Sequence, residues 1–520
     1  MYHILVIGFA LNVLFLGLRY LVEGSLGSTW LAWEAVWLPI VLMILPLSWR
    51  RWSIAFIAAA LTLVLLLAGI DRLTQLAFGR LFNPLLDLGL VDSAFNQLTE
   101  NVGVTLTLAI LASVLTIFAL STWFIARSLG ALHWPALTMR RRLVLGLALI
   151  VSLTFDLARP GGLTPHSATP ALDLVATHWQ QLQNTRRAYA DFKQHVADKG
   201  SLAPGRFPTL SDRDVILGFI ESYGVTALYD PRYAKRITPR LADIEQRLKE
   251  AGIHLASAKL TSPVQGGQSW LAHATLLSGL WVSTQRHYEL LLGQRQSTLI
   301  DDFRKTGHRN IAIMPALTQA WPQGKQLGYD HIFTAHNIPY QGPALNWVTM
   351  PDQFTWRFLE TRRQAHHGAL FAELALISSH APWTPILPLL EDWEGLDDGR
   401  VFERWANSGE TPETLWRDTE KVREHYAKAV EYALTAAFGY AERYLRDDAL
   451  LILVGDHQPA PLITGDDASR EVPIHILSRD KALITPFMEA GFDPGMMPNR
   501  QSSARAMSDF RPLMHTLFAE

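Results

Sequence analysis

The sequence predicts an N-terminal bundle of transmembrane α-helices followed by an α/β domain with a mixed, mostly parallel sheet sandwiched by helices. Three observations predict this fold class. Hydrophobic residues make up 49% of the chain, and nearly all of their excess lies before residue 158. After about residue 211, strand-like runs alternate with helical stretches, as in a sheet covered by helices. A length of 520 residues is enough for two or three structural units.

Five apolar segments precede residue 158. The first four are close to the roughly 20 residues that a helix needs to cross a bilayer. The fifth is shorter, and a packed or interfacial position is the alternative. No small-residue cleavage site follows the first segment, so we expect that segment to be retained. The five segments are Tyr2–Leu21, Trp30–Leu47, Ile54–Ile70, Val104–Ala126 and Leu143–Phe155.

Basic residues between the segments predict the orientation of the chain. Arg50 and Arg51 separate the second segment from the third, and residues 140–142, all arginine, separate the fourth from the fifth. The positive-inside rule places both loops in the cytoplasm. With five crossings, everything after the fifth segment then lies outside the cytoplasm.

These patterns divide the chain into three regions. Residues 1–157 form a transmembrane anchor of about five helices. Residues 158–210 form a linker rich in Pro, Gly, Ser and Thr, followed by an amphipathic juxtamembrane helix over Leu174–Lys199. Residues 211–520 form the α/β domain, with a long helical stretch near Pro412–Leu445. The expected strands are Val215–Ile220, Asn310–Ala316, Leu370–Ser378, Leu450–Val454 and Val472–Leu477.

Composition excludes several classes of function. The chain has no cysteine, so disulfides, a thiol nucleophile and zinc sites with cysteine ligands are excluded. A formal net charge of -2 argues against nucleic acid as a partner.

Polar side chains follow three of the expected strands. Glu221 comes after the first strand in ESYG, His380 follows another in SHAPW, and Asp456 and His457 follow a third in GDHQP. Open α/β sheets place their ligand chemistry at the carboxyl ends of strands. Two carboxylates and one imidazole suit Mn²⁺, Mg²⁺ or Zn²⁺. The sequence therefore predicts a site for one divalent cation at this edge of the sheet.

Ser269 is the candidate nucleophile, because it follows two glycines at the expected start of a helix in VQGGQSWLAH. Glycines let the backbone approach a ligand closely, and the first helical turn offers free N–H groups to an anion. His273, one turn later, shares the helix face with Ser269. Each residue also has a structural alternative when taken alone: Ser269 as an N-cap, Glu221 as a local pairing residue, His380 as a turn histidine, and His273 as a core histidine.

The motifs ESYG, GGQSW, GYDHIF, ISSHAPW and GDHQP, behind a five-span anchor, together resemble membrane-anchored members of the alkaline phosphatase/sulfatase superfamily. In its layout the chain resembles lipoteichoic acid synthases, phosphoglycerol transferases and lipid A phosphoethanolamine transferases. The resemblance covers roughly residue 214 to the end, plus the anchor. It implies an alkaline phosphatase-like domain on the periplasmic side of a bacterial inner membrane, acting in the cell envelope.

The resemblance also implies roles for individual residues. Glu221, Asp456 and His457 match the metal ligands, and Ser269 matches a hydroxyl nucleophile that also binds the metal, although the named relatives have threonine there. His380 matches a histidine that faces the substrate or the leaving group, which makes it the second catalytic residue. The substrate-binding candidates are His273, Trp270, Lys325 and Trp383.

The sequence departs from the family pattern in two places. In the stretch NIAIMPALTQAWPQGKQLGYD, lipoteichoic acid synthases carry histidine, acidic and arginine groups, whereas this chain offers mainly Lys325 and neutral polar residues. We therefore expect a different head-group pocket. The sulfatase signature after the nucleophile is also absent, so Thr261 and Ser262 remain second-choice nucleophiles.

The expected function is a metal-dependent transferase. It would move a phosphoryl-linked head group of the phosphoglycerol or phosphoethanolamine type from a membrane lipid to an envelope glycan or lipid, through a covalent Ser269 intermediate. The alternative within the superfamily is a membrane-anchored hydrolase of phosphate or sulfate esters that uses the same residues with water as the acceptor. A second alternative is a non-enzymatic binding or scaffold module of an envelope complex.

Overall fold

The computed structural model describes residues 2–91, 95, 98–99, 103–131, 137–157, 166–198, 200–318, 321–396 and 398–520. The chain forms two compact units. The first comprises Met1–Leu76 and Arg80–Ala188, and the second comprises Ala77–Gly79 and Tyr189–Glu520. The division at residues 157 and 210 remains a prediction, and residues 158–165 of the expected linker lie outside the described residues.

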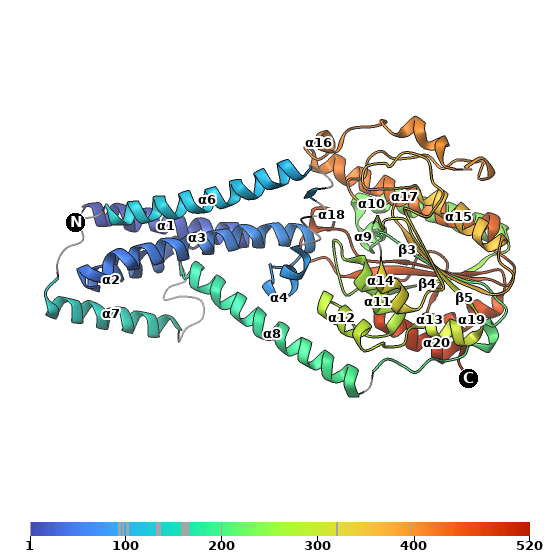
Figure 1. The fold of residues 1–520 in the computed structure, drawn as a ribbon, viewed down its shortest axis with the longest axis horizontal. Helices are drawn as coiled ribbons and strands as arrows, with labels where there is room; N and C mark the ends of the chain where they lie inside the picture. Colours follow the sequence, from blue (N-terminus) through green and yellow to red (C-terminus); the bar gives the residue numbers. More distant parts are fainter. Residues whose placement is uncertain are drawn as a thin grey trace. The chain divides into compact units, whose positions relative to one another are not determined.

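The first unit is helical (Figure 1). Two short strands, β1 (Leu31–Ala32) and β2 (Ser167–Ala168), pair in parallel. Close by, the buried Glu34 accepts hydrogen bonds from the Ala171 and Leu172 amides at the start of α8, at 2.8 and 3.2 Å. This carboxylate satisfies free amides of a helix N-terminus. The helices are α1 (Tyr2–Glu23), α2 (Glu34–Ile44), α3 (Leu47–Phe78), α4 (Pro84–Asp87), α6 (Val104–Gly130), α7 (Met139–Leu157) and α8 (Pro170–Asp198).

Three helices among the described residues are long and apolar enough to cross a membrane: Val6–Glu23, Ser48–Phe78 and Val104–Gly130. These three are the candidate spans by length and composition among the described residues, and the anchor of about five spans remains a prediction. The expected second span falls on α2, whose 11 residues extend roughly 16 Å, about half of the ~30 Å hydrocarbon core. The expected fifth span falls on α7, whose 19 residues include three arginines and an aspartate. The side of the membrane that the second unit occupies remains a prediction.

The amphipathic helix expected over Leu174–Lys199 corresponds to α8, which begins four residues earlier at Pro170 and ends at Asp198. Lys199 lies outside the described residues.

The second unit is built on a nine-stranded mixed sheet with the order β10-β4-β9-β8-β3-β7-β5-β6, and β11 pairs with β4. The neighbours β8, β3, β7, β5 and β6 run parallel, and β9 is antiparallel to both β8 and β4. The strands are β3 (Val215–Ile220), β4 (His254–Thr261), β5 (Arg309–Met314), β6 (His331–Thr334), β7 (Leu370–Leu376), β8 (Leu450–Gly455), β9 (Glu471–Ser478), β10 (Asp493–Pro494) and β11 (Arg505–Ala506).

Both faces of the sheet are covered by helices (Figure 1). Side chains along β3 alternate between two cores: Ile216 and Ile220 pack with one, and Leu217 and Phe219 with the other. This alternation is the two-residue period of a strand buried on both faces. The first core contains residues of α10 (Pro231–Glu250), α15 (Asp352–Gln364) and α17 (Thr419–Tyr444). The second contains residues of α11 (Ser269–Ser278), α12 (Gln285–Gly293), α13 (Leu299–Thr306), α19 (Lys481–Glu489) and α20 (Phe510–Phe518).

Candidate active site

Three neighbouring parallel strands carry the predicted residues to one edge of the sheet. In the register of the sheet, Ile220 at the end of β3 pairs with Leu376 of β7 on one side and Gly455 of β8 on the other. Glu221 follows β3, and Asp456 and His457 follow β8, so all three lie at the same carboxyl edge. His380 follows β7 four residues after the strand ends.

Glu221, Asp456 and His457 form one buried cluster, in which one ligand atom of each residue lies within 4.8 Å of the others. His457 Nε2 lies 3.5 Å from Glu221 Oε1 and 3.5 Å from Asp456 Oδ2. Backbone amides hold the other oxygen of Asp456: Oδ1 accepts from the Ser222 amide at 2.8 Å and from the His457 amide at 2.6 Å. Asp456 Oδ2 is therefore left facing the cluster.

The orientation of the His457 ring suits a metal ligand. Its Nδ1 lies 2.9 Å from the carbonyl oxygen of Gln458. A carbonyl oxygen only accepts hydrogen bonds, so Nδ1 carries the hydrogen and the neutral ring leaves its lone pair on Nε2. A backbone carbonyl that fixes the ring in this way is a common partner of metal-bound histidine.

The electrostatics of the cluster reflect two acids close to one imidazole. Burial by itself would raise the pKa of Glu221, but the imidazoles of His457 and His380 lower it to about 2. Burial and the negative charge of Glu221 raise the pKa of Asp456 to about 6. Burial opposes protonation of His457, yet the two carboxylates raise its pKa. A divalent cation would balance the two buried charges, because buried carboxylates need a partner of opposite charge.

Ser269 lies beside this cluster as the first residue of α11. Its Oγ donates to Glu221 Oε2 at 3.2 Å and lies 3.2 Å from His457 Nε2. The preceding Gln268 and Gly266 have φ values of 65° and 72°, so the chain turns sharply just before the helix. The donor set, with three oxygen-bearing side chains and one imidazole, fits Mn²⁺, Mg²⁺ or Zn²⁺. Glu221, Asp456, His457 and Ser269 are the residues that would hold such a cation.

The two second-choice nucleophiles lie elsewhere in the fold. Ser262 is fully buried, and its hydroxyl donates to the carbonyl oxygen of Asp456 at 2.6 Å. Thr261 is the last residue of β4 and pairs with Glu471 of β9. Ser262 therefore supports the backbone that carries Asp456, and among these three hydroxyl residues Ser269 is the one that contacts side-chain ligand atoms of the cluster.

His380 and Trp383 belong to the loop that follows β7. The His380 ring stacks on the half-exposed Trp347 with ring centroids 5.6 Å apart. Trp383 is buried: its indole N–H donates to the Ser379 carbonyl at 2.7 Å, and its ring stacks on Trp416, which is 45% exposed. Trp347 and Trp416 are thus two exposed aromatic residues that stack on this loop, and neither was predicted from the sequence.

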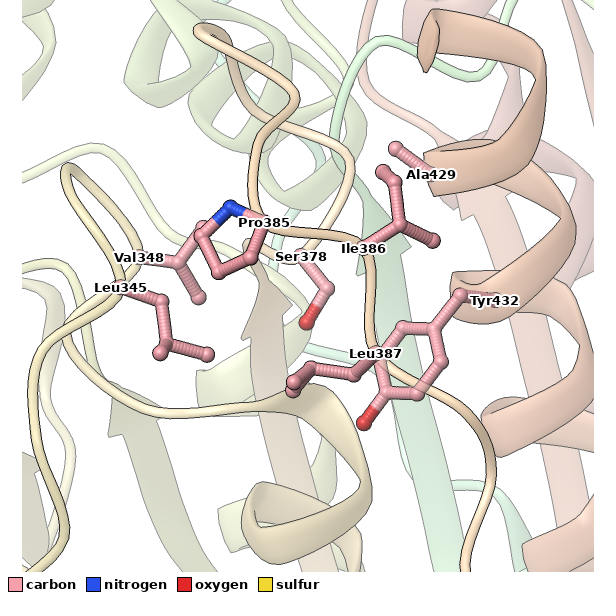
Figure 2. A pocket seen from close by; sticks show the side chains of 8 residues that line it. All are labelled: Leu345, Val348, Ser378, Pro385, Ile386, Leu387, Ala429 and Tyr432. Carbon is pink, nitrogen blue, oxygen red and sulfur yellow. The ribbon is translucent and has the colours of Figure 1, made fainter. Parts of the chain in front are cut away.

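A small pocket lies behind the same loop (Figure 2). None of the predicted catalytic, metal or substrate residues lines it, so it is separate from the Glu221 cluster. Its lining is mainly apolar and comprises Leu345, Val348, Ser378, Pro385, Ile386, Leu387, Ala429 and Tyr432.

The remaining substrate-binding candidates, Trp270, His273 and Lys325, each have different surroundings. Trp270 is 38% exposed, and its indole N–H donates to Gln285 Oε1 at 3.0 Å. His273 donates from Nδ1 to the buried Glu373 at 2.7 Å. Lys325 is exposed on α14 (Pro322–Leu327), and none of the contacts described in this structure joins it to the cluster.

Two supporting residues were not found from the sequence. The Ser222 hydroxyl donates to Glu221 Oε1 at 2.7 Å, and the Tyr426 hydroxyl of α17 donates to the Ser222 carbonyl at 2.9 Å. Ser222 stands next to Glu221 in ESYG, so its position was a usable signal. Tyr426 lies in the middle of a long helix, where nothing in the local pattern indicates a site.

No protein-family model matches the chain, and no curated protein matches its sequence. Solved structures do match its fold. The integral membrane lipooligosaccharide phosphoethanolamine transferase A from Neisseria meningitidis aligns over 99% of this chain and 94% of its own, with a TM-score of 0.50 and 14% identity.

Two further structures align over part of the chain. The lipoteichoic acid synthase LtaP from Listeria monocytogenes covers 64% of this chain and 77% of its own, with a TM-score of 0.41 and 14% identity. The Streptococcus pyogenes phosphoglycerol transferase GacH, in complex with sn-glycerol-1-phosphate, covers 64% of this chain and 79% of its own, with a TM-score of 0.39 and 12% identity.

The full-length similarity confirms the fold class predicted from the sequence, an N-terminal apolar helical region followed by an α/β domain with a mixed sheet between helices. The chain therefore shares the fold of the integral membrane phosphoethanolamine transferase A over nearly its full length.

Proposed function

We propose that this chain is a membrane-anchored, metal-dependent transferase. It moves a phosphoryl-linked head group, of the phosphoglycerol or phosphoethanolamine type, from a membrane lipid to an envelope glycan or lipid. The observation that carries the proposal is the position of Ser269 Oγ, 3.2 Å from both Glu221 Oε2 and His457 Nε2. The phosphoethanolamine transferase of Neisseria meningitidis, which shares the fold over the full length, supports the same class of reaction.

The first half of the reaction transfers the head group to the protein. Glu221, Asp456, His457 and Ser269 would hold a divalent cation, which would supply Lewis-acid chemistry at the hydroxyl and at the phosphoryl oxygens. Ser269 gives up its proton to solvent water. Ser269 Oγ attacks phosphorus in line, the bond from phosphorus to the diacylglycerol oxygen breaks, and His380 protonates that oxygen. Free amides in the first turn of α11 stabilise the charge on the phosphoryl oxygens.

The second half transfers the head group to the acceptor. His380 removes the proton from an acceptor hydroxyl, whose oxygen attacks phosphorus and releases Ser269. Because the donor lipid lies in the plane of the membrane, the apolar helices of the first unit raise its effective concentration at the site. If water replaces the acceptor, the same residues hydrolyse the ester, which is the alternative function.

Mass spectrometry of the full-length protein in detergent tests the proposal. Protein loaded with Mn²⁺ is mixed with vesicles of phosphatidylethanolamine or phosphatidylglycerol. We expect a covalent adduct on Ser269 with the mass of the phosphoryl head group, together with free diacylglycerol. The control Ser269→Ala should bind metal and form no adduct. Wild-type protein that binds metal but forms no adduct with either lipid contradicts the proposal, and release of free head-group phosphate favours hydrolysis.

A further inference from the structure

A buried acid, Glu373, hydrogen-bonds to His273 on the helix that begins with Ser269, and the proposed mechanism does not use it. Glu373 stands in the middle of β7 with 1% of its surface exposed, within the apolar run LFAELAL. Its carboxylate accepts hydrogen bonds from His273 Nδ1 at 2.7 Å and from the Tyr329 hydroxyl. We propose that His273, protonated on both ring nitrogens, binds a phosphoryl oxygen of the substrate through Nε2–H. Glu373, which accepts Nδ1–H and balances the charge of the ring, is the positioning residue that orients it. This inference rests on the proposed function.

The geometry of α11 places His273 near the reacting group. His273 follows Ser269 by four residues, so the two side chains share one helix face with Cβ atoms about 6 Å apart. Side chains in a helix lean toward its N-terminus, which directs the His273 imidazole toward the turn that begins with Ser269. One helix then offers the nucleophile, the free amides of its first turn and an imidazole N–H.

The contacts of the ring fix its direction. Phe219 of β3 stacks on the His273 ring with centroids 3.7 Å apart and planes at 15°. Nδ1 is occupied by Glu373, and the two ring nitrogens of an imidazole point in different directions, so Nε2 faces away from that carboxylate. No hydrogen bond to Nε2 is found among the described residues, and the side chain keeps 12% of its surface exposed. Nε2 is therefore available to a ligand.

His273 does not serve as the base for Ser269 in this arrangement. The Ser269 hydroxyl already contacts Glu221 and His457, each at 3.2 Å. A phosphoryl group attached to Ser269 carries oxygens beyond Oγ, and these are the atoms that an imidazole one turn away can reach. Hydrogen bonds between an imidazole N–H and an anionic oxygen are about twice as strong as neutral ones.

If His273 and Glu373 had only a structural role, apolar side chains in their place would give a core of equal or greater stability. Burying a carboxylate costs several kcal/mol, and well-packed apolar residues are often as stable or more stable in the same place. The neighbours of Glu373 on β7 that face the same side are Phe371 and Ala375, both apolar. The retention of a buried acid here is consistent with a role in holding His273.

Binding of inorganic phosphate to the full-length, Mn²⁺-loaded protein tests the inference. In His273→Asn, the amide can replace Nδ1 as the donor to Glu373, but nothing replaces Nε2. We expect phosphate to bind about tenfold more weakly to this variant, the size of effect that follows from losing one charge-assisted hydrogen bond, with Mn²⁺ affinity unchanged. Unchanged phosphate affinity overturns the inference.

A triple variant separates binding from structure. His273→Phe, Glu373→Leu and Tyr329→Phe together replace the whole polar group by apolar side chains and leave no buried partner unpaired. We expect this protein to fold and bind Mn²⁺ yet lose phosphate affinity about tenfold as well. The matched control Tyr329→Phe alone, which keeps His273 and Glu373, should bind phosphate like the wild type. Wild-type affinity in the triple variant shows a structural pair only and overturns the inference.

The outcomes also separate this inference from the proposed function. If the wild type forms no adduct on Ser269 while His273→Asn still weakens phosphate binding, the transferase proposal fails and the anion-binding role of His273 stands. If the adduct forms and phosphate affinity does not depend on His273, the transferase proposal stands and this inference is wrong.

Discussion

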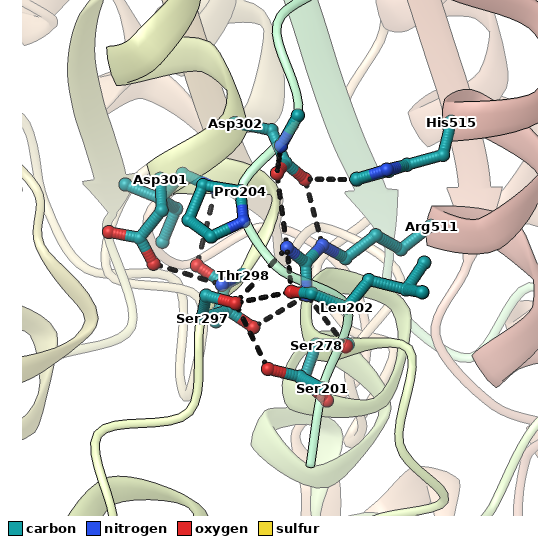
Figure 3. A network of polar contacts seen from close by, with 12 residues as sticks. Ser201, Leu202, Pro204, Ser278, Ser297, Thr298, Asp301, Asp302, Arg511 and His515 are labelled. Carbon is teal, nitrogen blue, oxygen red and sulfur yellow. Dashed lines mark hydrogen bonds and ion pairs between the residues drawn. The ribbon is translucent and has the colours of Figure 1, made fainter. Parts of the chain in front are cut away.

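Arg511 and Asp302 form a two-point ion pair in which neither side chain is exposed to solvent (Figure 3). Arg511 Nε donates to Asp302 Oδ2 at 2.8 Å, and Nη2 donates to Oδ1 at 3.0 Å. The same guanidinium donates to the carbonyl oxygens of Leu202 and Ser297 at 2.9 and 2.7 Å. This pair joins α20, at the C-terminus, to α13 and to the segment that leads from α8 into the second unit.

Breaking this pair is expected to destabilise the second unit strongly. Arg511→Met leaves the Asp302 charge buried without its main partner, which typically costs about 3–5 kcal/mol. The measurement is chemical denaturation of the full-length protein in detergent, followed by tryptophan fluorescence. The control is Lys428→Met, which removes a more exposed ion pair on α17, where Lys428 Nζ and Glu424 Oε1 lie 2.7 Å apart. This variant should change the free energy of unfolding by less than about 1 kcal/mol. Equal effects of the two variants would contradict the prediction.

Removing the Ser269 hydroxyl should stop the transfer reaction and leave metal binding intact. We expect Ser269→Ala to lower the transfer rate by a factor on the order of 10³ or more, measured as diacylglycerol release from vesicles. Mn²⁺ should still bind, because Glu221, Asp456 and His457 are intact. Ser269→Thr keeps a hydroxyl and should retain more activity than Ser269→Ala. A fully active Ser269→Ala protein would show that another residue is the nucleophile.

Chelation should inactivate the protein reversibly. Excess EDTA is expected to abolish transfer, and added Mn²⁺ or Zn²⁺ should restore it, because two buried carboxylates and one imidazole lie within 4.8 Å of one another. Glu221→Gln and Asp456→Asn should each lower the measured metal content, since each removes one anionic ligand. Full activity in EDTA, with no metal detected by mass spectrometry, would exclude metal dependence.

Metal affinity should depend on pH. Burial and the charge of Glu221 raise the pKa of Asp456 to about 6, and the two carboxylates also raise the pKa of His457. Below pH 6 a cation has to displace a proton from Asp456, so affinity should fall at least about tenfold for each pH unit below this value. Above pH 6 the carboxylate is ionised and its contribution levels off. Calorimetric titration with Mn²⁺ between pH 5 and 8 measures this, and a constant affinity would contradict it.

The absence of cysteine allows a direct test of orientation. Asp447→Cys introduces the single thiol of the chain at a fully exposed position before β8, and Met139→Cys introduces one at the 70% exposed start of α7. If the second unit is periplasmic, a membrane-impermeant maleimide should label the first variant in intact spheroplasts. It should label the second only after permeabilisation. The reverse pattern would place the second unit in the cytoplasm.

The central strands were predictable because they are continuous apolar runs. Val215–Ile220 matches β3 at both ends, and the runs for β7 and β8 begin at the observed residues, Leu370 and Leu450. β4 was missed because HLASAKLT mixes polar and apolar residues, and β6 because it has only four residues. These outer strands are defined by pairing with distant segments, which a local pattern does not contain.

The site was predictable wherever a residue directly follows a strand. Glu221, Asp456 and His457 come together because parallel neighbours end at one edge. Tyr329, by contrast, reaches Glu373 only through the tertiary fold. Glu373 itself was a missed signal, since a single acid inside the run LFAELAL was visible in the sequence. Hydrophobicity alone does not reveal where a helix ends: the expected second span covered Trp30–Leu47, whereas α2 has 11 residues.

The strand order has a consequence for the synthesis of the protein. Of the nine strands in the sheet, β3 comes first in the chain, but its two neighbours, β7 and β8, are made much later. A growing polypeptide therefore holds Glu221 and Ser269 long before it acquires the residues that complete their surroundings. Until β8 has emerged and paired with β3, the nascent chain lacks Asp456 and His457, and the cluster around Glu221 cannot form.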